Sequence, residues 1–255
     1  MMKIMNSSCD FCKRVFSKRY SSQRFCSVLC SNRFNLNNKN LVFLPEYCEE
    51  LAEFFGILLG DGSVTKYFTK VYLNAIADVD YKSFVENLAQ SLFKGASVTV
   101  RRRLEQGTID IQISSRDVCD YLRKIGFDPR IRKVPPWIFR RKTFIAATVR
   151  GLFDTEGCVS IKYFRGKGGN YFYKQLTVTN ANKNILAFLE KSLIMLGYKP
   201  TKNSKKNIYI SNRKDIEKYL YNIGSHNPKI LYKLKVEELK NFTYGGLRRM
   251  VRHQS

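Results

Sequence analysis

Apolar residues recur along the chain with two different spacings. Residues 54–59 and 149–153 are almost continuously apolar, which predicts helices that are buried on most sides. Short segments rich in β-branched and aromatic residues predict strands, at 64–69, 71–77, 98–100, 109–113, 159–164, 171–179, 201–203 and 207–211. Between these strands, apolar residues recur with helical spacing and predict helices at 84–92, 118–125, 184–196 and 214–223.

The same order of elements occurs twice, which indicates a duplicated domain. Residues 54–62, FFGILLGDG, resemble residues 149–157, VRGLFDTEG, at an offset of 95 positions. Residues 117–126 and 215–224 form a second matched pair at an offset of 98. Two matches at nearly one period predict a repeat of about a hundred residues. We therefore predict an α+β fold with two pseudo-symmetric copies of a helix-strand-strand-helix-strand-strand-helix unit.

Breaks in this pattern predict the domain boundaries. Pro135 and Pro136 cannot lie within a helix, so they mark the junction between the copies. The predicted order is a cysteine-containing module at 1–34, a polar linker at 35–45, a first half at 46–134, a junction at 135–142, and a second half with a C-terminal extension at 143–255.

Each repeat opens with a helix that ends in an acid. Asp61 and Glu156 immediately precede Gly62 and Gly157. Helix C-termini favour cations, and two neighbouring acids must share a counter-charge. An acid in this position on both helices therefore predicts that the two carboxylates bind a metal ion.

These segments resemble the motif of the LAGLIDADG homing endonucleases. Gly56 and Gly151 match the first glycine of that motif, and Asp61 and Glu156 match its metal-binding acid. Leu59 stands where the motif has an inner Asp. The resemblance extends from about residue 46 to the C-terminal region. It implies the single-chain form, a monomer with two motifs.

The resemblance implies a site-specific endonuclease that cuts both strands of a long, nearly asymmetric DNA target and leaves staggered ends. It also implies a role in the spread of a mobile intron. Such cleavage uses Mg²⁺ or Mn²⁺ to activate water and to hold the leaving oxygen. Because Gly56 and Gly151 allow the helices to approach closely, the metal site is expected at Asp61 and Glu156. The same site would include backbone carbonyls at Gly60 and Thr155.

The resemblance further implies a basic residue near the scissile phosphate. Lys233 is the best match in the second copy, and Lys133 is its counterpart in the first. Such a lysine stabilises the transition state or orders the attacking water, and a general phosphate contact is the alternative. Asp78 and Asn180 end equivalent strands and are expected to complete the shell around the metal ions.

The strands are expected to form a saddle over DNA, with alternate side chains pointing at the groove. For each such residue, an ordinary solvated surface position is the alternative. The predicted base or phosphate contacts are Thr65, Tyr67, Thr69, Arg101, Arg103, Gln112, Ser160, Lys162, Gln175 and Thr177.

The composition agrees with a polyanionic partner. The 255 residues include 45 Lys and Arg against 21 Asp and Glu, which gives a formal net charge of +24. This diffuse excess favours a nucleic-acid partner, with an anionic membrane as a weaker candidate. The resemblance implies that this partner is double-stranded DNA, with intron RNA as a further partner. We predict an intracellular protein with no membrane contact, because there is no signal peptide and no apolar stretch of roughly 18 residues.

Two cysteine pairs near the N-terminus have the spacing of zinc ligands. Cys9 and Cys12 are followed by Cys26 and Cys30, and segment 24–30 resembles the second knuckle of a treble-clef zinc finger. So short a segment cannot bury a core, so Zn²⁺ would supply its folding free energy. Disulfides are the alternative, which the missing secretory signal disfavours.

Two other functions stay open at the level of the sequence. One is an RNA maturase, or a non-cleaving DNA- or RNA-binding protein, derived from this fold. Loss of either acid would favour it, and both acids are present. The other is a zinc-containing structural RNA-binding protein, which needs no Mg²⁺ and leaves the duplicated acids unexplained.

Overall fold

The computed structural model describes residues 6–37, 41–166 and 169–235. Contacts divide the chain into two compact units, Met1–Leu41 and Val42–Ser255. The first unit contains the four clustered cysteines. Its described elements are an antiparallel pair, β1 (Asn6–Ser8) and β2 (Val15–Ser17), followed by helix α1 (Val28–Asn37).

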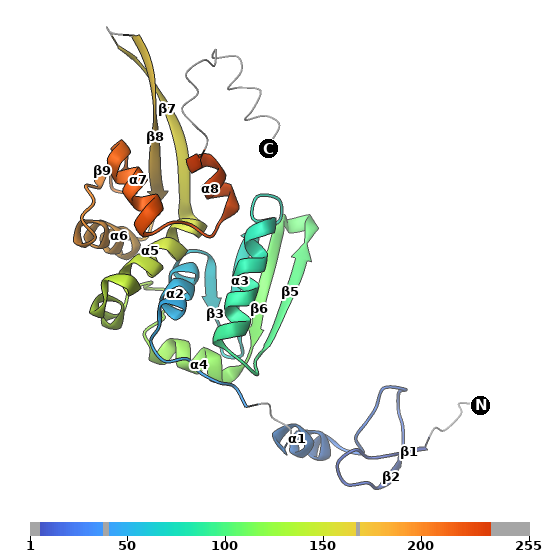
Figure 1. Ribbon diagram of the computed structural model, residues 1–255. Helices are drawn as coiled ribbons and strands as arrows, with labels where there is room; N and C mark the ends of the chain where they lie inside the picture. The colour runs from blue at the N-terminus through green and yellow to red at the C-terminus, as the bar shows by residue number, and fades with distance from the viewer. Residues whose placement is uncertain (1–5, 38–40, 167–168, 236–255) are drawn as a thin grey trace. The chain divides into compact units, whose positions relative to one another are not determined.

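The second unit contains both repeats, each built on a four-stranded antiparallel sheet (Figure 1). The first sheet has the order β3-β4-β6-β5 and the second the order β7-β8-β10-β9. The first repeat consists of α2 (Glu49–Asp61), β3 (Gly62–Val64), β4 (Phe68–Asn74), α3 (Val79–Leu92), β5 (Ser97–Arg103), the 3₁₀ turn η1 (Leu104–Gln106), β6 (Thr108–Ser114) and α4 (Arg116–Lys124).

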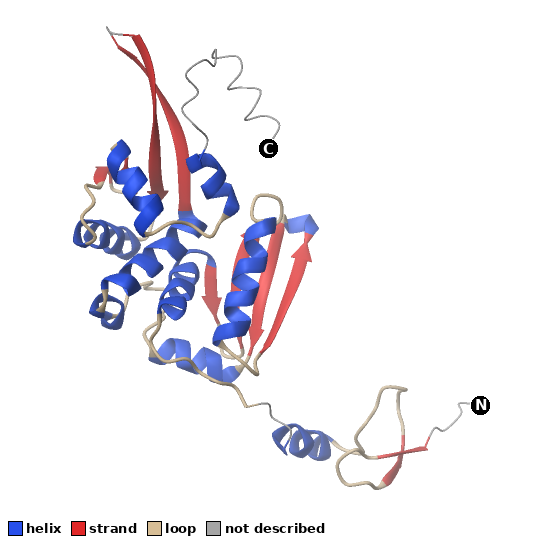
Figure 2. Ribbon diagram, in the orientation of Figure 1, coloured by secondary structure: helices blue, strands red, loops and turns tan. Residues whose placement is uncertain are grey.

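The second repeat follows the 3₁₀ turn η2 (Pro136–Arg140) and repeats this order. It consists of α5 (Lys142–Glu156), β7 (Gly157–Gly166), β8 (Gly169–Thr179), α6 (Lys183–Met195), β9 (Thr201–Ser204), β10 (Asn207–Ile210) and α7 (Arg213–Asn222). Helix α8 (Pro228–Lys235) ends the described part. Helices pack on each sheet, α3 and α4 on the first and α5, α6 and α7 on the second (Figure 2). The predicted α+β fold with two copies of one unit is confirmed.

The motif helices α2 and α5 pack against each other at very short range. A Cβ atom at Gly56 would lie 2.2 Å from the carbonyl oxygen of Thr148, and one at Gly151 would lie 2.2 Å from that of Glu53. Only glycine permits this approach. The contact is reciprocal, because each glycine faces the carbonyl three residues before the other glycine. Both glycines singled out in the sequence therefore lie at the helix interface.

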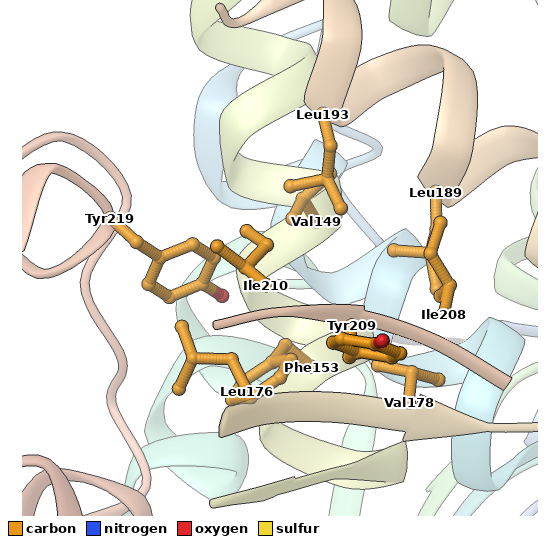
Figure 3. A pocket seen from close by; sticks show the side chains of 10 residues that line it. All are labelled: Val149, Phe153, Leu176, Val178, Leu189, Leu193, Ile208, Tyr209, Ile210 and Tyr219. Atoms are coloured by element: carbon orange, nitrogen blue, oxygen red, sulfur yellow. The ribbon is translucent and has the colours of Figure 1, made fainter. Parts of the chain in front are cut away.

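Apolar side chains fill the space between these helices and the sheets. In the second half, ten residues surround a small pocket between α5, α6, α7 and the sheet (Figure 3). Its lining is almost wholly apolar, and the buried Tyr219 hydroxyl has no hydrogen-bond partner. A pocket with so few polar groups offers little to orient a ligand, so we interpret it as imperfect core packing.

The first hairpin differs from the sequence prediction in its strand boundaries. The predicted strands at 64–69 and 71–77 are replaced by β3, which ends at Val64, and β4, which runs without a break through Lys70. The turn lies at 65–67, where the Phe68 N–H donates to the Thr65 hydroxyl oxygen at 3.1 Å. A threonine turn of this kind leaves no glycine or proline signal in the sequence.

Replacing Gly56 by alanine should destabilise the second unit by about 3 kcal/mol or more, because the new methyl group meets a backbone carbonyl that cannot rotate away. Gly151→Ala should behave in the same way. Gly107→Ala is the control. Its Cβ meets open space at a φ of 62°, so it should cost only about 1–2 kcal/mol. Chemical denaturation measures the free energy of unfolding of the three variants. Equal losses of stability in all three would contradict the packing argument.

Candidate active site

The two motif acids end the paired helices and lie close together. A Cβ atom at Gly60 would be 2.1 Å from Thr155 Oγ1 and 3.1 Å from Glu156 Cγ, so the last turns are in tight contact. Burial, and then the negative charges of Glu156 and Asp78, raise the pKa of Asp61 to about 7. Burial also raises the pKa of Glu156. Two half-buried acids with raised pKa values form a site that favours a divalent cation.

Arg132 reaches these acids from the loop after α4. Its Nη1 donates to the carbonyl oxygens of Leu59 and Gly60 at 2.6 and 2.5 Å, and its Nη2 donates to that of Gly62 at 3.4 Å. Its charge lowers the pKa of both acids. Its φ of 51° lies in the left-handed region, so this contact is kept against local strain. The neighbouring Lys133, which the sequence suggested, is exposed.

Lys229 is the corresponding base from the second half. Its Nζ donates to Asp78 Oδ1 at 2.8 Å, and Asn227 Nδ2 donates to the same oxygen at 2.9 Å. The charge of Lys229 lowers the pKa of Asp61. The predicted Lys233 lies one turn further along α8 and is half-buried. Sequence matching gave the right helix but not the residue that meets Asp78, because that contact depends on where α8 begins.

Asn180 lies beside Glu156 in the second half, as Asp78 lies beside Asp61 in the first. Its side-chain oxygen accepts a hydrogen bond from the Asn182 N–H at 2.7 Å, and its amide forms a hydrogen bond with Glu156 that lowers the pKa of that acid. One side of the site therefore has two carboxylates, and the other has a carboxylate and an amide. This asymmetry is visible in the sequence, but the different partners of the two residues are not.

Most of the predicted DNA-contacting residues lie on the faces of the sheets that point away from the core. The strand register puts them opposite the buried positions of each strand. These residues are Arg101, Arg103, Gln112, Ser160, Lys162, Gln175 and Thr177. Arg103 is also paired with the buried Asp110, with 2.9 Å between Nε and Oδ2.

The prediction fails at Thr69. This residue is fully buried, and its hydroxyl lies 3.6 Å from Cys119 Sγ. The reason is the strand boundary, since β4 begins at Phe68 and places Lys70 and Tyr72 on the outer face instead. Lys70 and Tyr72 are therefore outer-face residues that the sequence analysis missed. Thr65 and Tyr67, also predicted as contacts, lie in the turn between β3 and β4 rather than on a strand.

The four N-terminal cysteines lie together within the first unit. All their sulfur atoms lie within 4.8 Å of one another, and Cys26 Sγ is 3.6 Å from both Cys12 Sγ and Cys30 Sγ. Thiolates around one Zn²⁺ at about 2.3 Å would be about 3.8 Å apart, so the cluster has the size of a tetrahedral site. The thiols are not joined by disulfides. Burial raises the pKa of Cys9, but backbone N–H groups lower it overall to about 6.

Comparison with known proteins finds a family-model match in the second half. Residues 143–224 match the family model of the LAGLIDADG-like domain. A structure from a study of mesophilic variants of the homing endonuclease I-DmoI aligns with a TM-score of 0.50 and 16% identity, over 69% of this chain and 95% of that one. These findings confirm the resemblance seen in the sequence, and the second establishes the fold.

Two curated relatives come from Methanocaldococcus jannaschii. The replication factor C small subunit is 27% identical over 218 residues, which cover 81% of this chain and 11% of that protein. The uncharacterized protein MJ0314 is 27% identical over 162 residues, which cover 61% of this chain and 58% of that protein. The chain thus spans between about a tenth and just over half of the length of these relatives.

Among residues 6–37, 41–166 and 169–235, no helix is both long and apolar enough to cross a lipid bilayer.

Asp61→Asn should raise the Tm of metal-free protein at pH 8 and leave it nearly unchanged at pH 4. The folded-state pKa of about 7 lies above the usual 3.8, so the stability linked to the protonated acid is lost as pH rises through 7. Asparagine does not ionise, so the variant avoids this loss of stability at high pH. Asp80→Asn, at an exposed acid of α3, is the matched control and should show no such pH dependence. An Asp61→Asn effect of equal size at both pH values would contradict the assignment.

Proposed function

We propose that this chain, which carries a LAGLIDADG-like domain at residues 143–224, is a metal-dependent endonuclease that cuts both strands of a specific DNA site. The observation that carries this proposal is the pair Asp61 and Glu156 at the ends of two glycine-packed helices. Both acids have raised pKa values, chiefly because they are buried, so a bound cation would stabilise their charged forms. The net charge of +24 supports a nucleic-acid substrate.

The donor groups at this site fit Mg²⁺ or Mn²⁺. Asp61 and Glu156 offer carboxylate oxygens, and Gly60 and Thr155 offer backbone carbonyls, so the set contains only oxygen. The Gly60 carbonyl already accepts a hydrogen bond from Arg132 and keeps a second lone pair. When bound, the ion would activate a water molecule and stabilise the leaving oxygen.

The chain's own cations would complete the chemistry. Arg132 and Lys229 place positive charge beside the acids, where negative charge would accumulate on the phosphate in the transition state. Lys133 and Lys233 are then outer phosphate contacts. Asp78 and Asn180 orient these groups, Asp78 through Lys229 and Asn180 through Glu156.

The two sheets would read unequal half-sites of one long target. Strands β7 and β8 pair from Gly157 to Val178, whereas β3 and β4 pair only from Gly62 to Val71. Unequal surfaces are consistent with a monomer on a nearly asymmetric site that is cut with staggered ends. Spread of a mobile intron would be the biological role, with intron RNA as a further partner.

We also propose that Cys9, Cys12, Cys26 and Cys30 bind one Zn²⁺. The spacing of the four sulfur atoms supports this, because it matches the separation of thiolates around one tetrahedral Zn²⁺. The first unit has no comparable apolar core among its described residues, where Cys9 is the buried hydrophobic position. Zinc would therefore supply much of its folding free energy.

Cleavage of a randomised duplex library with Mg²⁺ tests the proposed function. The unmodified protein should give discrete cut sites, and Asp61→Asn and Glu156→Gln should each slow cutting at least about a hundredfold while binding persists. Tight, Mg²⁺-independent binding without cuts would instead indicate a maturase or a non-cleaving binding protein. A matched substitution at Asp80 should cut normally.

The zinc site predicts a specific metal content. Purified protein should contain one Zn²⁺ per chain by elemental analysis, and Cys12→Ser should lose it. Cys158→Ser, at an exposed thiol outside the cluster, should retain full content. Removal of zinc by a chelator should make the first unit sensitive to protease, because little else holds it folded. Full protease resistance after zinc removal would contradict this role.

A further inference from the structure

A buried polar cluster joins the two motif helices to the segment that leads into α8. The Glu53 carboxylate, on α2, accepts hydrogen bonds from Arg150 Nη2 and His226 Nδ1, both at 2.6 Å. On α5, Asp154 accepts from the Ser225 hydroxyl at 2.5 Å and from the His226 N–H at 2.7 Å. Glu53 and Asp154 are 3% and 1% exposed, whereas the His226 side chain is 42% exposed, so the carboxylates are buried and the imidazole lies at the edge of the cluster.

The cluster has the composition of a metal site but is already neutralised. Ligand atoms of Glu53, Asp154 and His226 lie within 4.8 Å of one another. The Arg150 guanidinium occupies one side of Glu53, however, and its Nη1 donates to the Ile223 carbonyl at 3.0 Å. A cation would have to displace this arginine. The arrangement is therefore better described as a clamp on residues 223–226.

This clamp fixes the residues that follow it at the active site. Asn227 Nδ2 donates to the Asp154 carbonyl and to Asp78 Oδ1, both at 2.9 Å, and Lys229 then reaches Asp78. His226 also stacks on Phe84 of α3, with 4.2 Å between ring centroids. The segment belongs to the second half, but its side chains meet the first half at Phe84 and Asp78.

The second base, Arg132, is held by different contacts, although its guanidinium also meets the end of α2 beside Asp61. Asn182 and Asn184 of the second half donate to the Ile131 carbonyl at 3.3 and 2.9 Å, directly before Arg132. Leu59, at the position equivalent to Asp154, is apolar and buried, so this side has no ionic clamp of the same kind. The two bases are thus anchored by different contacts, and each anchor includes residues from the opposite half.

We infer that Glu53 and His226 are positioning residues that act through Lys229 and serve only the Asp61 side of the site. The inference rests on the proposed endonuclease function. It assigns no contact with DNA to either residue. It predicts that loosening the clamp changes cleavage of one strand and not of the other, which a general loss of folding would not do.

The ratio of the two strand-cleavage rates tests this inference in the full-length protein. Each strand of a target duplex is labelled separately, and Lys229→Met identifies the strand that depends on Lys229. His226→Phe keeps the ring on Phe84 but loses the bond to Glu53, so it should slow that strand about tenfold or more and change the other less than about twofold. Glu53→Gln should also slow cleavage of the Lys229-dependent strand. Equal slowing of both strands, or no slowing, would overturn the inference.

Two further variants separate positioning from other effects. Because His226 acts through Lys229, the double variant His226→Phe with Lys229→Met should be no slower than Lys229→Met alone. Additive losses would overturn the inference. Asn184→Ala loosens the anchor next to Arg132 instead, and Arg132 lies beside both acids, so this variant should not reproduce the strand selectivity of His226→Phe.

A readout without cleavage keeps the inference testable should the protein cut no DNA. In the unmodified protein, the Lys229 ammonium is paired with Asp78 and should react slowly with an amine-acetylating reagent. His226→Phe should increase acetylation of Lys229 severalfold, as measured by peptide mass spectrometry, whereas Asn184→Ala should not. Unchanged reactivity of Lys229 would contradict the clamp, whatever the outcome of the cleavage assays.

Discussion

The structure depends on the direct backbone contact between α2 and α5. Glycine at 56 and 151 removes the side chains that would keep the helices apart, and each helix meets a carbonyl of the other. The rest of the site follows from this distance. Because both helices end at the same level, two acids that repel each other are held side by side at the base of two sheets. Packing energy in the core maintains a charge arrangement that would not persist on an open surface.

The repulsion between these acids explains why anchored cations lie beside them. Arg132 and Lys229 both sit beside acids, and each comes from a loop or helix end rather than from the sheets. Long basic side chains are flexible in solution, so a fixed cation requires bonds at its tip and along the backbone that carries it. The carbonyl oxygens at the end of α2 bind the tip of the Arg132 side chain, and Asp78 binds the tip of the Lys229 side chain.

The sequence predicted the fold well because its signals were local or repeated. A nine-residue match and a ten-residue match at nearly one period were enough to predict duplication, and strand and helix patterns placed nearly every element of the two repeats. The acids were identified because they break a charge rule. Thr69 was misplaced since a threonine turn shifted the strand start without leaving a glycine or proline. Arg132, Lys229 and the Glu53–His226 bond were missed because they join residues that are 70 or more positions apart, where the sequence carries no periodic signal.

The anchoring of each base by the opposite half has a consequence for how such a protein can change by recombination. If the chain were joined at residues 135–142 to a foreign second half, the new partner would bring its own segment in place of residues 223–229. Asp78 would then face a side chain selected in another protein, although both halves were individually intact. Functional exchange of halves therefore requires that the contacting residues on both sides of the interface be exchanged together as matched pairs. The part of the chain that must be inherited together is larger than one folded repeat.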